Sequence, residues 1–247
     1  MFDYEAPEQL LKNRVILVTG AGSGIGKAAA LAYARHGATI ILCGRSIANL
    51  EQTWDEIDAE GLPEAVIHPL DLEHATEEAY TQLSESLSNE FGCLHGLLHN
   101  ASLLGQRTPV ESYSLQTWNQ VMQVNVNATF QLSKALLPLL KKAEDAALIF
   151  TSSGVGRRGR AYWGAYAVSK FATEGLVQVL ADELTSTTSI RVNCINPGAT
   201  NTQMRRDAYP AEEPSTNPPP EQIMPLYLYL MGPESEGVCG QSLDAQS

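Results

Sequence analysis

The sequence lacks an apolar run long enough to cross a membrane. A bilayer-spanning helix needs about 20 consecutive apolar residues, and no stretch of the 247 residues approaches that length. The first residues, MFDYEAPEQLLKNR, include acidic side chains and no apolar centre, unlike a secretory signal. We therefore expect a cytoplasmic protein that does not insert into a membrane.

Cysteine is scarce and scattered. Cys43, Cys93, Cys194 and Cys239 form no C-x-x-C pair and have no histidine pair nearby. Cys43 and Cys194 fall inside apolar, strand-like runs, where a thiol usually packs as a small hydrophobic side chain. We expect reduced structural thiols rather than disulfides, and no metal site.

Basic residues are also few. The chain has 16 Lys and Arg against 28 Asp and Glu, which gives a formal net charge of −12. General binding to nucleic acid or to an anionic membrane surface needs a positive protein surface. This composition argues against both partners and leaves a small molecule as the expected ligand.

Short apolar runs rich in β-branched residues alternate with helix-length segments along the chain. The expected strands are RVILVT (14–19), ATIILC (38–43), AVIHPL (65–70), CLHGLLH (93–99), AALIFTS (146–152) and IRVNCIN (190–196). The expected helices are 24–36, 47–60, 73–91, 115–141 and 161–184. Continuous apolar strands between helices are typical of a parallel sheet covered on both faces.

This alternation predicts an α/β protein with a doubly wound parallel sheet of about seven strands, a Rossmann fold with helices on both faces. No repeat or linker divides the chain, so we expect one domain over residues 1–247. Its dinucleotide-binding half would cover about 14–150, and its catalytic and substrate half about 151–247.

The segment 201–222 departs from the pattern. It is rich in polar residues and holds five prolines, which exclude a long helix. A plain surface connection would explain it. We favour a lid beside the ligand crevice, because so long a loop in a compact domain is commonly functional and the segment follows the sixth expected strand.

A glycine-rich loop follows the first strand and opens the first helix. In TGAGSGIG (19–26), Gly20, Gly24 and Gly26 let the backbone turn tightly and approach a pyrophosphate, whose charge a helix N-terminus favours. Ser23 and Ile25 belong to the same expected contact surface. The spacing is T-G-x-x-x-G-x-G rather than G-x-G-x-x-G, but the position between strand and helix supports dinucleotide binding.

The end of the second strand indicates which cofactor is bound. An acidic residue there would bind the ribose 2′-hydroxyl of NAD, whereas an arginine pairs with the 2′-phosphate of NADP. The sequence has Arg45 and no acidic residue, so we predict NADP(H), with NAD(H) as the alternative. Ser46 adds a hydroxyl donor for that phosphate. Asp71 is placed either to contact the adenine or to cap the following helix.

The stretch SSGVGRRGRAYWGAYAVSK (152–170) carries candidate catalytic groups. Tyr166 and Lys170 are four residues apart, so on a helix they share one face. A phenol has a pKa near 10, and a neighbouring ammonium with a positively charged nicotinamide would lower that pKa. Tyr162 has tyrosine rather than a cation four residues on, so we select Tyr166 as the acid/base.

The motifs Y-x-x-x-K, T-G-x-x-x-G-x-G, HNAS (99–102), MQVNVNAT (122–129), TSS (151–153) and NPG (196–198) form one ordered set across nearly the whole chain. Together they resemble the short-chain dehydrogenase/reductase family. Stretches such as RVNCINPG and IMPLYLYLMG are similar to its YciK group of bacterial oxidoreductases. An ordered set of this kind is far more specific than any single motif.

The resemblance implies roles for the catalytic residues. Tyr166 would exchange the proton of the substrate oxygen and also contact the cofactor. Lys170 would hold the nicotinamide ribose and lower the pKa of the phenol. The family's serine stands about thirteen residues before the tyrosine, which selects Ser153 over Ser152. Asn125 would interrupt a helix and hold a water in the proton relay to Lys170, with Asn127 as its rival.

The resemblance also implies cofactor contacts. Asn100 and Ala101 match the N-A-G element at the adenosine ribose, and Pro197, Gly198 and Thr202 match the segment that meets the nicotinamide. Two departures stand out. His99 and Ser102 replace the commoner Asn and Gly of N-N-A-G, and the C-terminal GQSLDAQS lacks a frequent glycine pair. The family further implies a homodimer or homotetramer through the helices near 115–141 and 161–184.

The predicted function is an NADP(H)-dependent oxidoreductase that transfers a hydride between the nicotinamide and a small carbonyl or alcohol substrate. The alternative is a sensor or scaffold protein that binds NADP(H) with little turnover, but such proteins typically lose the tyrosine or the lysine. Epimerase or dehydratase chemistry usually needs a longer chain. Arg157, Arg158 and Arg160 could bind an anionic substrate group or form surface ion pairs, and the residues leave both readings open.

Overall fold

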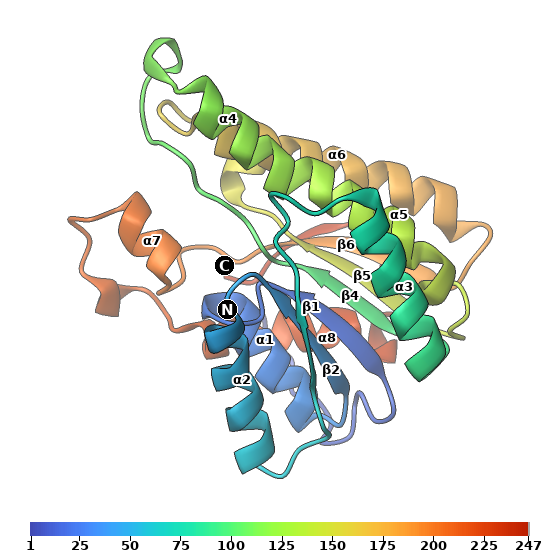
Figure 1. Ribbon diagram of the computed structural model, residues 1–247. Coiled ribbons are helices and arrows are strands. Elements are labelled where there is room, and N and C mark those ends of the chain that lie inside the picture. Colours follow the sequence, from blue (N-terminus) through green and yellow to red (C-terminus); the bar gives the residue numbers. More distant parts are fainter. Residues whose placement is uncertain (247) are drawn as a thin grey trace.

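All six expected apolar runs form strands, and a seventh strand follows near the C-terminus. The computed structural model describes residues 1–246 (Figure 1). Its strands are β1 (Val15–Thr19), β2 (Thr39–Gly44), β3 (Val66–Pro69), β4 (Gly96–His99), β5 (Ala146–Thr151), β6 (Ile190–Asn196) and β7 (Ser242–Asp244). They form one parallel sheet in the order β3-β2-β1-β4-β5-β6-β7. The predicted doubly wound sheet is confirmed.

The strand order reverses between β1 and β4, which pair directly. The chain winds from β1 outward to β3 and then from β4 outward to β7, so the crossovers run in opposite directions from this point. In open α/β sheets, a crevice at the carboxyl ends of the strands at such a reversal is the usual ligand site.

The helices cover both faces of the sheet (Figure 1). They are α1 (Gly24–Arg35), α2 (Ile47–Ala59), α3 (Glu77–Phe91), α4 (Leu115–Met122), α5 (Ala128–Leu140), α6 (Gly164–Thr185), α7 (Gln203–Ala208) and α8 (Met224–Met231). One core cluster joins α1 and α8 to Ile16 and Val18, and the other joins α3, α5 and α6 to Leu17. Alternate residues of β1 therefore enter opposite cores, as the period of two in a strand requires.

Three helix boundaries differ from those expected. α3 begins at Glu77, because Thr76 accepts a hydrogen bond from the backbone of Ala79 and caps the helix there. α6 begins at Gly164 rather than 161. The expected helix 115–141 is interrupted by a π-helical turn over Gln123–Asn127, and this interruption includes Asn125, the residue that the family resemblance expected to interrupt a helix.

The segment 201–222 leaves the body of the molecule beside the carboxyl ends of the strands (Figure 1, orange). It holds only α7, of six residues, and the 3₁₀ turn Pro214–Thr216, followed by Pro220–Ile223. The prediction that prolines exclude a long helix is confirmed. The backbone N–H of Asn201 donates to Pro218 O at 2.9 Å, which closes the loop at its base.

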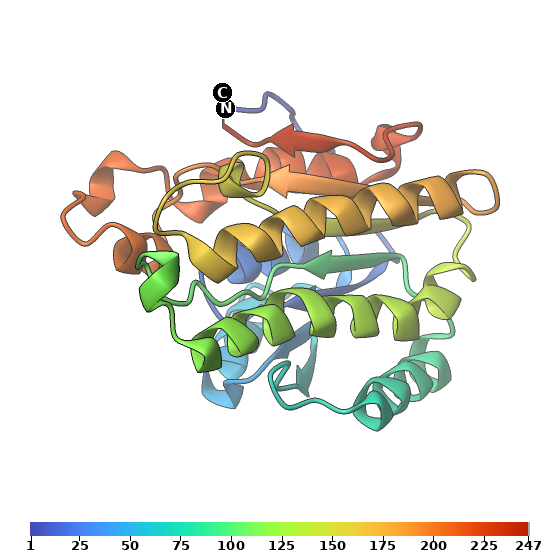
Figure 2. The same cartoon turned by 90° about the horizontal axis from the view of Figure 1, so that it is seen from above.

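The two ends of the chain lie side by side in Figure 2. The backbone N–H of Phe2 donates to the carbonyl of Ala245 at 3.0 Å. β7 pairs with β6 through Ser242 opposite Cys194 and Asp244 opposite Asn196. The C-terminal strand thus completes the sheet beside the residues expected to be catalytic.

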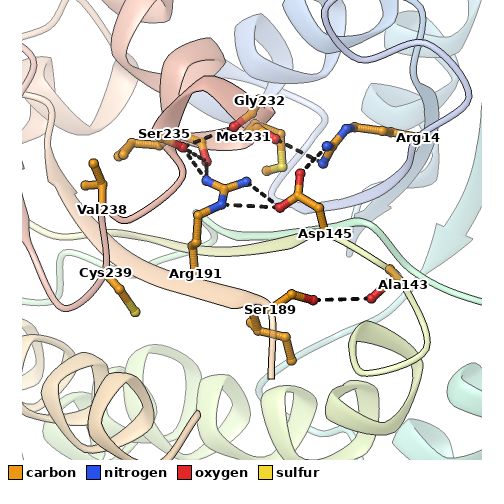
Figure 3. A network of polar contacts seen from close by, with 12 residues as sticks. Arg14, Ala143, Asp145, Ser189, Arg191, Met231, Gly232, Ser235, Val238 and Cys239 are labelled. Atoms are coloured by element: carbon orange, nitrogen blue, oxygen red, sulfur yellow. Dashed lines mark hydrogen bonds and ion pairs between the residues drawn. The ribbon is translucent and has the colours of Figure 1, made fainter. Parts of the chain in front are cut away.

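A polar network lies at the opposite end of the strands (Figure 3). Asp145 accepts hydrogen bonds from Arg14 and from Arg191, whose Nη2 lies 3.1 Å from Asp145 Oδ1. Arg191 is buried and also donates to Leu230 O at 2.6 Å and to Ser235. The network joins the starts of β1, β5 and β6 to the turn after α8.

None of the helices within residues 1–246 combines the length and the apolar character needed to cross a bilayer. Those same residues contain no group of three His, Cys, Asp or Glu side chains suited to a metal ion. The cytoplasmic location and the lack of a metal stay predictions.

Candidate active site

A cavity of about 590 Å³ opens at the carboxyl ends of the strands and runs from the glycine-rich loop to the segment 201–222. Most of the predicted site residues line it. They are Gly20, Ser23, Gly24, Ile25, Arg45, Ser46, Asp71, Asn100, Ala101, Ser153, Tyr166, Lys170, Pro197, Gly198 and Thr202. Gly26 and Asn125 do not line the cavity.

The glycine-rich loop needs its glycines for two different reasons. Gly20 and Gly24 have φ angles of 69° and 53°, in the left-handed region that glycine adopts without strain. Gly26 instead allows close packing, because a Cβ there would lie 2.2 Å from Gly20 O and 2.6 Å from Asn100 Nδ2. Gly26 therefore permits close packing behind the cavity lining and does not itself line the cavity.

The N-terminus of α1 is open toward the cavity. Ser23, at the N-cap position, makes no side-chain capping hydrogen bond, and the first turn holds no acidic residue. By contrast, Ser46 caps α2 by accepting from Asn49 N. The first backbone N–H groups of α1 and its dipole thus suit an anionic group such as a pyrophosphate. The residues present fit a dinucleotide.

Arg45 and Asp71 lie at the outer end of the cavity. The Arg45 side chain is exposed and makes no hydrogen bond or ion pair with any of the described residues 1–246. Asp71 accepts a hydrogen bond from Glu73 N at 3.1 Å, and its Oδ2 lies 2.9 Å from His74 Nδ1. The contact with His74 holds the pKa of Asp71 below its ordinary value. Asp71 therefore caps the turn before α3, while Thr76 caps the helix.

Thr19 is a site residue that the sequence analysis missed. Its hydroxyl accepts hydrogen bonds from the backbone N–H of Asn100 at 2.9 Å and of Ala101 at 3.1 Å, and donates to Leu98 O. It therefore fastens the end of β4 to the glycine-rich loop. The threonine that opens T-G-x-x-x-G-x-G was the available signal.

Ser153, Tyr166 and Lys170 meet at the inner end of the cavity. Ser153 interacts with the Tyr166 hydroxyl and acts to lower the pKa of the phenol. Lys170 Nζ donates to Thr151 O at 2.8 Å and lies 5.5 Å from the centre of the Tyr166 ring. Three elements bring them together: the end of β5, the loop after it and the first turns of α6.

Burial changes the acidity of both titratable groups. It raises the pKa of Tyr166 to about 12, while the hydrogen bond with Ser153 acts in the opposite direction. It lowers the pKa of Lys170 to about 8, while Cys194 and Glu174 oppose that fall. The proton affinities of the phenol and the amine are thus set mainly by exclusion of water.

Asn125 lies in the π-helical turn and is 3% exposed. Its Oδ1 accepts from Leu103 N at 2.8 Å, and its Nδ2 donates to Leu103 O and to Ser169 Oγ, each at 3.0 Å. Asn127 is exposed and donates to Gln123. Of the two candidates, Asn125 is the one that ties the loop after β4 to α6 behind Lys170.

The three arginines after Ser153 lie outside the cavity lining. Arg157 Nη1 lies 2.7 Å from Asp244 Oδ1, and Arg157 Nε donates to Ser242 Oγ. Arg160 donates to the Tyr209 hydroxyl at 3.3 Å. Arg158 is exposed, and its side chain has no polar partner within residues 1–246. Surface and inter-element pairing is therefore the reading that the geometry favours.

An apolar wall faces Tyr166. It contains Val155, Trp163, Ala167 and Ala208, with Leu104, Met204 and Tyr209 packed against them. Behind the wall, the guanidinium of Arg107 lies 4.6 Å from the Trp163 ring centre and 4.7 Å from that of Tyr209. Arg107 was not predicted as a site residue, because nothing in its local sequence indicates these partners.

The two departures from the family motifs have local explanations. His99 is buried, stacks on Phe150 and hydrogen-bonds to Ser133 Oγ at 2.8 Å. Burial lowers the pKa of His99 to about 3, so the ring is neutral. At the C-terminus, Gln246 Nε2 donates to Pro197 O at 2.7 Å and to Ala199 O at 3.0 Å, so the C-terminal segment holds the loop after β6.

A doubly wound sheet has an open helix N-terminus at its crevice, with a buried tyrosine and lysine and a half-buried serine beside it. This combination defines a nicotinamide-dependent oxidoreductase. A sequence profile described as short chain dehydrogenase matches residues 14–213. The chain belongs to the short-chain dehydrogenase/reductase family, and the predicted NAD(P)-dependent enzyme of this family is confirmed.

Individual relatives agree with the predicted subgroup. The chain is 52% identical over 243 residues to an uncharacterized oxidoreductase, YciK, of Escherichia coli K12, covering 98% of this chain and 96% of that protein. A solved structure from Pseudomonas syringae assigned to the short-chain dehydrogenases is 60% identical, with a TM-score of 0.98 and full coverage of both chains. Another, from Escherichia coli CFT073 in complex with NADPH, is 53% identical, with a TM-score of 0.93 and coverage of 98% and 100%.

Proposed function

We propose that this protein interconverts a small carbonyl compound and the corresponding alcohol with NADP(H), and that Tyr166 exchanges the proton. The observation that carries the proposal is the meeting of Ser153, Tyr166 and Lys170 at the inner end of the cavity that the glycine-rich loop lines. The reacting carbon would lie between this group and the nicotinamide, which supplies or accepts the hydride when bound.

Each of the three side chains has a defined task. Ser153 donates a hydrogen bond to the substrate oxygen and holds it against the Tyr166 hydroxyl. In the reductive direction, the hydroxyl of Tyr166 transfers its proton to that oxygen. Lys170 holds its ammonium beside the phenol ring, 5.5 Å from the ring centre, which favours the phenolate left by proton transfer. Asn125 positions α6 through Ser169.

The preference for NADP(H) follows from the outer end of the cavity. Arg45 offers an exposed guanidinium that makes no hydrogen bond with residues 1–246, although its charge acts on Asp71, and Ser46 adds a hydroxyl. Guanidinium binds phosphate through paired hydrogen bonds, and no acidic side chain ends β2 to attract a ribose hydroxyl. The NADPH complex of the Escherichia coli CFT073 relative supports the same assignment.

The remaining predicted contact residues would bind the cofactor from both halves of the chain. Gly20, Ser23, Gly24 and Ile25 would cradle the pyrophosphate at the start of α1, with Gly26 packed behind them. Asn100, Ala101 and Asp71 would contact the adenosine side. Pro197, Gly198 and Thr202 would meet the nicotinamide side. The chain would work as one domain, because both halves line a single cavity.

Residues 201–222 are the proposed lid. Tyr209 packs against Trp163, with ring centres 6.0 Å apart, and Ala208 belongs to the wall that faces Tyr166. Two hydrogen bonds of 2.6 Å between Arg205 and Glu212 stiffen the segment internally. The wall is apolar and aromatic, so the substrate would present an apolar body beside its carbonyl group. The exposed apolar side chains Leu115, Phe130, Phe171 and Val179 on α4, α5 and α6 support the expected homodimer or homotetramer.

Replacing Tyr166 by phenylalanine tests the proposal. Oxidation of NADPH is followed with a panel of aldehydes, ketones and quinones, and Tyr166→Phe is expected to lower kcat by about 10² to 10⁴ because the proton donor is gone. NADPH binding, measured by fluorescence, should change little. Activity that survives Tyr166→Phe would refute the mechanism, and tight NADPH binding without turnover on any substrate would favour a sensor protein.

A further inference from the structure

Glu174 is a buried carboxylate directly behind the catalytic pair. It follows Lys170 by four residues, as Lys170 follows Tyr166, so the three side chains lie along one face of α6. The residue is 9% exposed and does not line the cavity. A charged group is rarely buried without partners, because removal from water is costly. The groups that bind the Glu174 carboxylate therefore indicate why it is buried here.

The partners come from three other parts of the chain. Ser152, at the end of β5, donates its hydroxyl to Glu174 Oε1. Ser242 of β7 donates to the same oxygen at 2.9 Å. Arg157 Nε lies 3.7 Å from it, and the Arg157 guanidinium also binds Asp244. One carboxylate thus connects the residue before Ser153, the loop after it and the last strand of the sheet.

We propose that Glu174 is a positioning residue for the reaction assigned above: it holds the strand end that carries Ser153 and keeps the Lys170 ammonium charged where Tyr166 needs it. The proposal rests on the proposed function for its catalytic consequence only. Glu174 touches neither the cavity nor the reacting atoms, so its influence passes through Ser152 and Lys170.

The groups around Lys170 show which charge stabilises its ammonium. Four groups act on the Lys170 ammonium: the Tyr166 ring and Glu174 on α6, Cys194 on β6 and His99 on β4. Burial raises the pKa of the Cys194 thiol far above neutrality, and burial lowers that of His99 to about 3, so both are uncharged near pH 8. Among the groups of residues 1–246 that act on Lys170, the Glu174 carboxylate is therefore the one whose negative charge stabilises the ammonium.

Removal of the Glu174 charge is expected to lower the pKa of Lys170. Burial places the pKa of Lys170 at about 8, and Glu174 acts to raise it. Removal of the carboxylate charge lets that pKa fall further, so the ammonium is lost at a lower pH. Activity that needs the ammonium then declines earlier as pH rises. Glu174→Gln keeps an acceptor oxygen for Ser152 and Ser242 and removes only the charge.

The first test is the pH profile of kcat for the wild type, Glu174→Gln and the control Glu183→Gln, an exposed residue of the same helix. The alkaline limb of Glu174→Gln is expected to move down by about one pH unit, the size typical of a close opposite charge, while the control matches the wild type. Near pH 6 the two profiles should converge. An alkaline limb that does not move would overturn the proposal.

A second measurement does not depend on turnover. The ¹³Cε signal of Lys170 in ¹³C-lysine-labelled apoprotein, identified by its loss in Lys170→Met, reports the protonation of Lys170 itself. Glu174→Gln should shift this titration to lower pH. Arg157→Met removes a positive charge from the other side of Glu174 and should shift it to higher pH, which serves if Glu174→Gln does not fold. A purely structural Glu174 would lower the melting temperature and leave the Lys170 titration in place, which would refute the proposal even if the assigned reaction were wrong.

Discussion

At the scale of single residues, the cofactor preference depends on Arg45. Its guanidinium lies exposed at the end of β2 and binds no other side chain of residues 1–246. A free cation at this position can give all of its hydrogen bonds to a 2′-phosphate. A hydrogen bond to a charged group contributes about 1.5 to 3 kcal/mol.

Arg45→Ala is therefore expected to raise the Kd of NADPH by about 10- to 100-fold, since 1.4 kcal/mol corresponds to a factor of ten. The Kd of NADH should change less than about threefold, because NADH has no 2′-phosphate to lose. Fluorescence titration with both nucleotides measures this. Arg158→Ala, an exposed arginine outside the cavity lining, is the control, and an equal loss for both nucleotides would contradict the prediction.

Single residues predicted from local spacing lie where they were expected, and their chemical roles stay predictions. The spacing of Tyr166 and Lys170 on one helix placed both at the cavity. The three arginines after Ser153 could not be resolved, because their partners Asp244 and Tyr209 are far along the chain. Thr19 was missed although it opens the motif that was found.

At the scale of elements, Arg107 joins the proposed lid to the body. Its guanidinium lies between the Trp163 ring at the start of α6 and the Tyr209 ring after α7, and it donates to Ala208 O. A cation over an aromatic ring contributes about 0.5 to 2 kcal/mol. The Arg107 guanidinium contacts two rings and a carbonyl, so it stabilises the packing of the lid against the apolar wall.

Arg107→Met keeps an apolar stem and removes the charge. KM for the carbonyl substrate is expected to rise by about tenfold, because the lid closes less firmly over the bound substrate. NADPH affinity should stay close to that of the wild type, and cleavage within 201–222 by a protease should become faster. Arg158→Met is the matched control. A KM equal to that of the wild type would show that Arg107 does not hold the lid.

Elements were predicted well because their signals are local. All six apolar runs became strands, and each helix-length segment contains a helix. The π-helical turn at Gln123–Asn127 depends instead on Asn125, which turns inward to bind Leu103 and Ser169. α8 was not anticipated. Its residues are apolar on nearly all sides, since six of its eight are buried, and periodicity does not identify such a helix.

At the scale of the whole molecule, the network around Asp145 joins the ends of three strands to the turn after α8 (Figure 3). Burial acts to raise the pKa of Asp145, but the hydrogen bond from Arg14 and the charge of Arg191 outweigh it. They hold the pKa below its ordinary 3.8. The network therefore stabilises the fold above that pH, and the contribution is lost as pH falls through the lower, folded-state value.

Asp145→Asn leaves the buried Arg191 without a charged partner. It is expected to lower the free energy of unfolding by about 3 kcal/mol at pH 7, or the melting temperature by about 8 °C. The difference from the wild type should shrink as pH falls through the folded-state pKa of Asp145, which lies below 3.8. Thermal unfolding at several pH values measures both effects.

Glu144→Gln, at the exposed neighbouring residue, is the control and should leave the melting temperature within about 2 °C of the wild type. A difference between Asp145→Asn and wild type that stays constant from pH 7 down to the pH at which Asp145 is seen to protonate would mean that packing, and not the ion pairs, is responsible.

By itself the sequence determined the parallel α/β sheet, the glycine-rich loop before α1 and the identity of Ser153, Tyr166 and Lys170 as the reactive candidates. The sheet, the loop and the pairing of Tyr166 with Lys170 follow from periodicity, turn chemistry and short spacings, which are set within one element and its neighbours. Ser153 was selected over Ser152 by the resemblance to the short-chain dehydrogenase/reductase family. Only the tertiary structure decided what Glu174, Arg157 and Arg107 do. Their partners lie between 17 and 102 residues away, and the contact between distant segments depends on how the strands are ordered in the sheet and how the C-terminal strand and the lid pack against it.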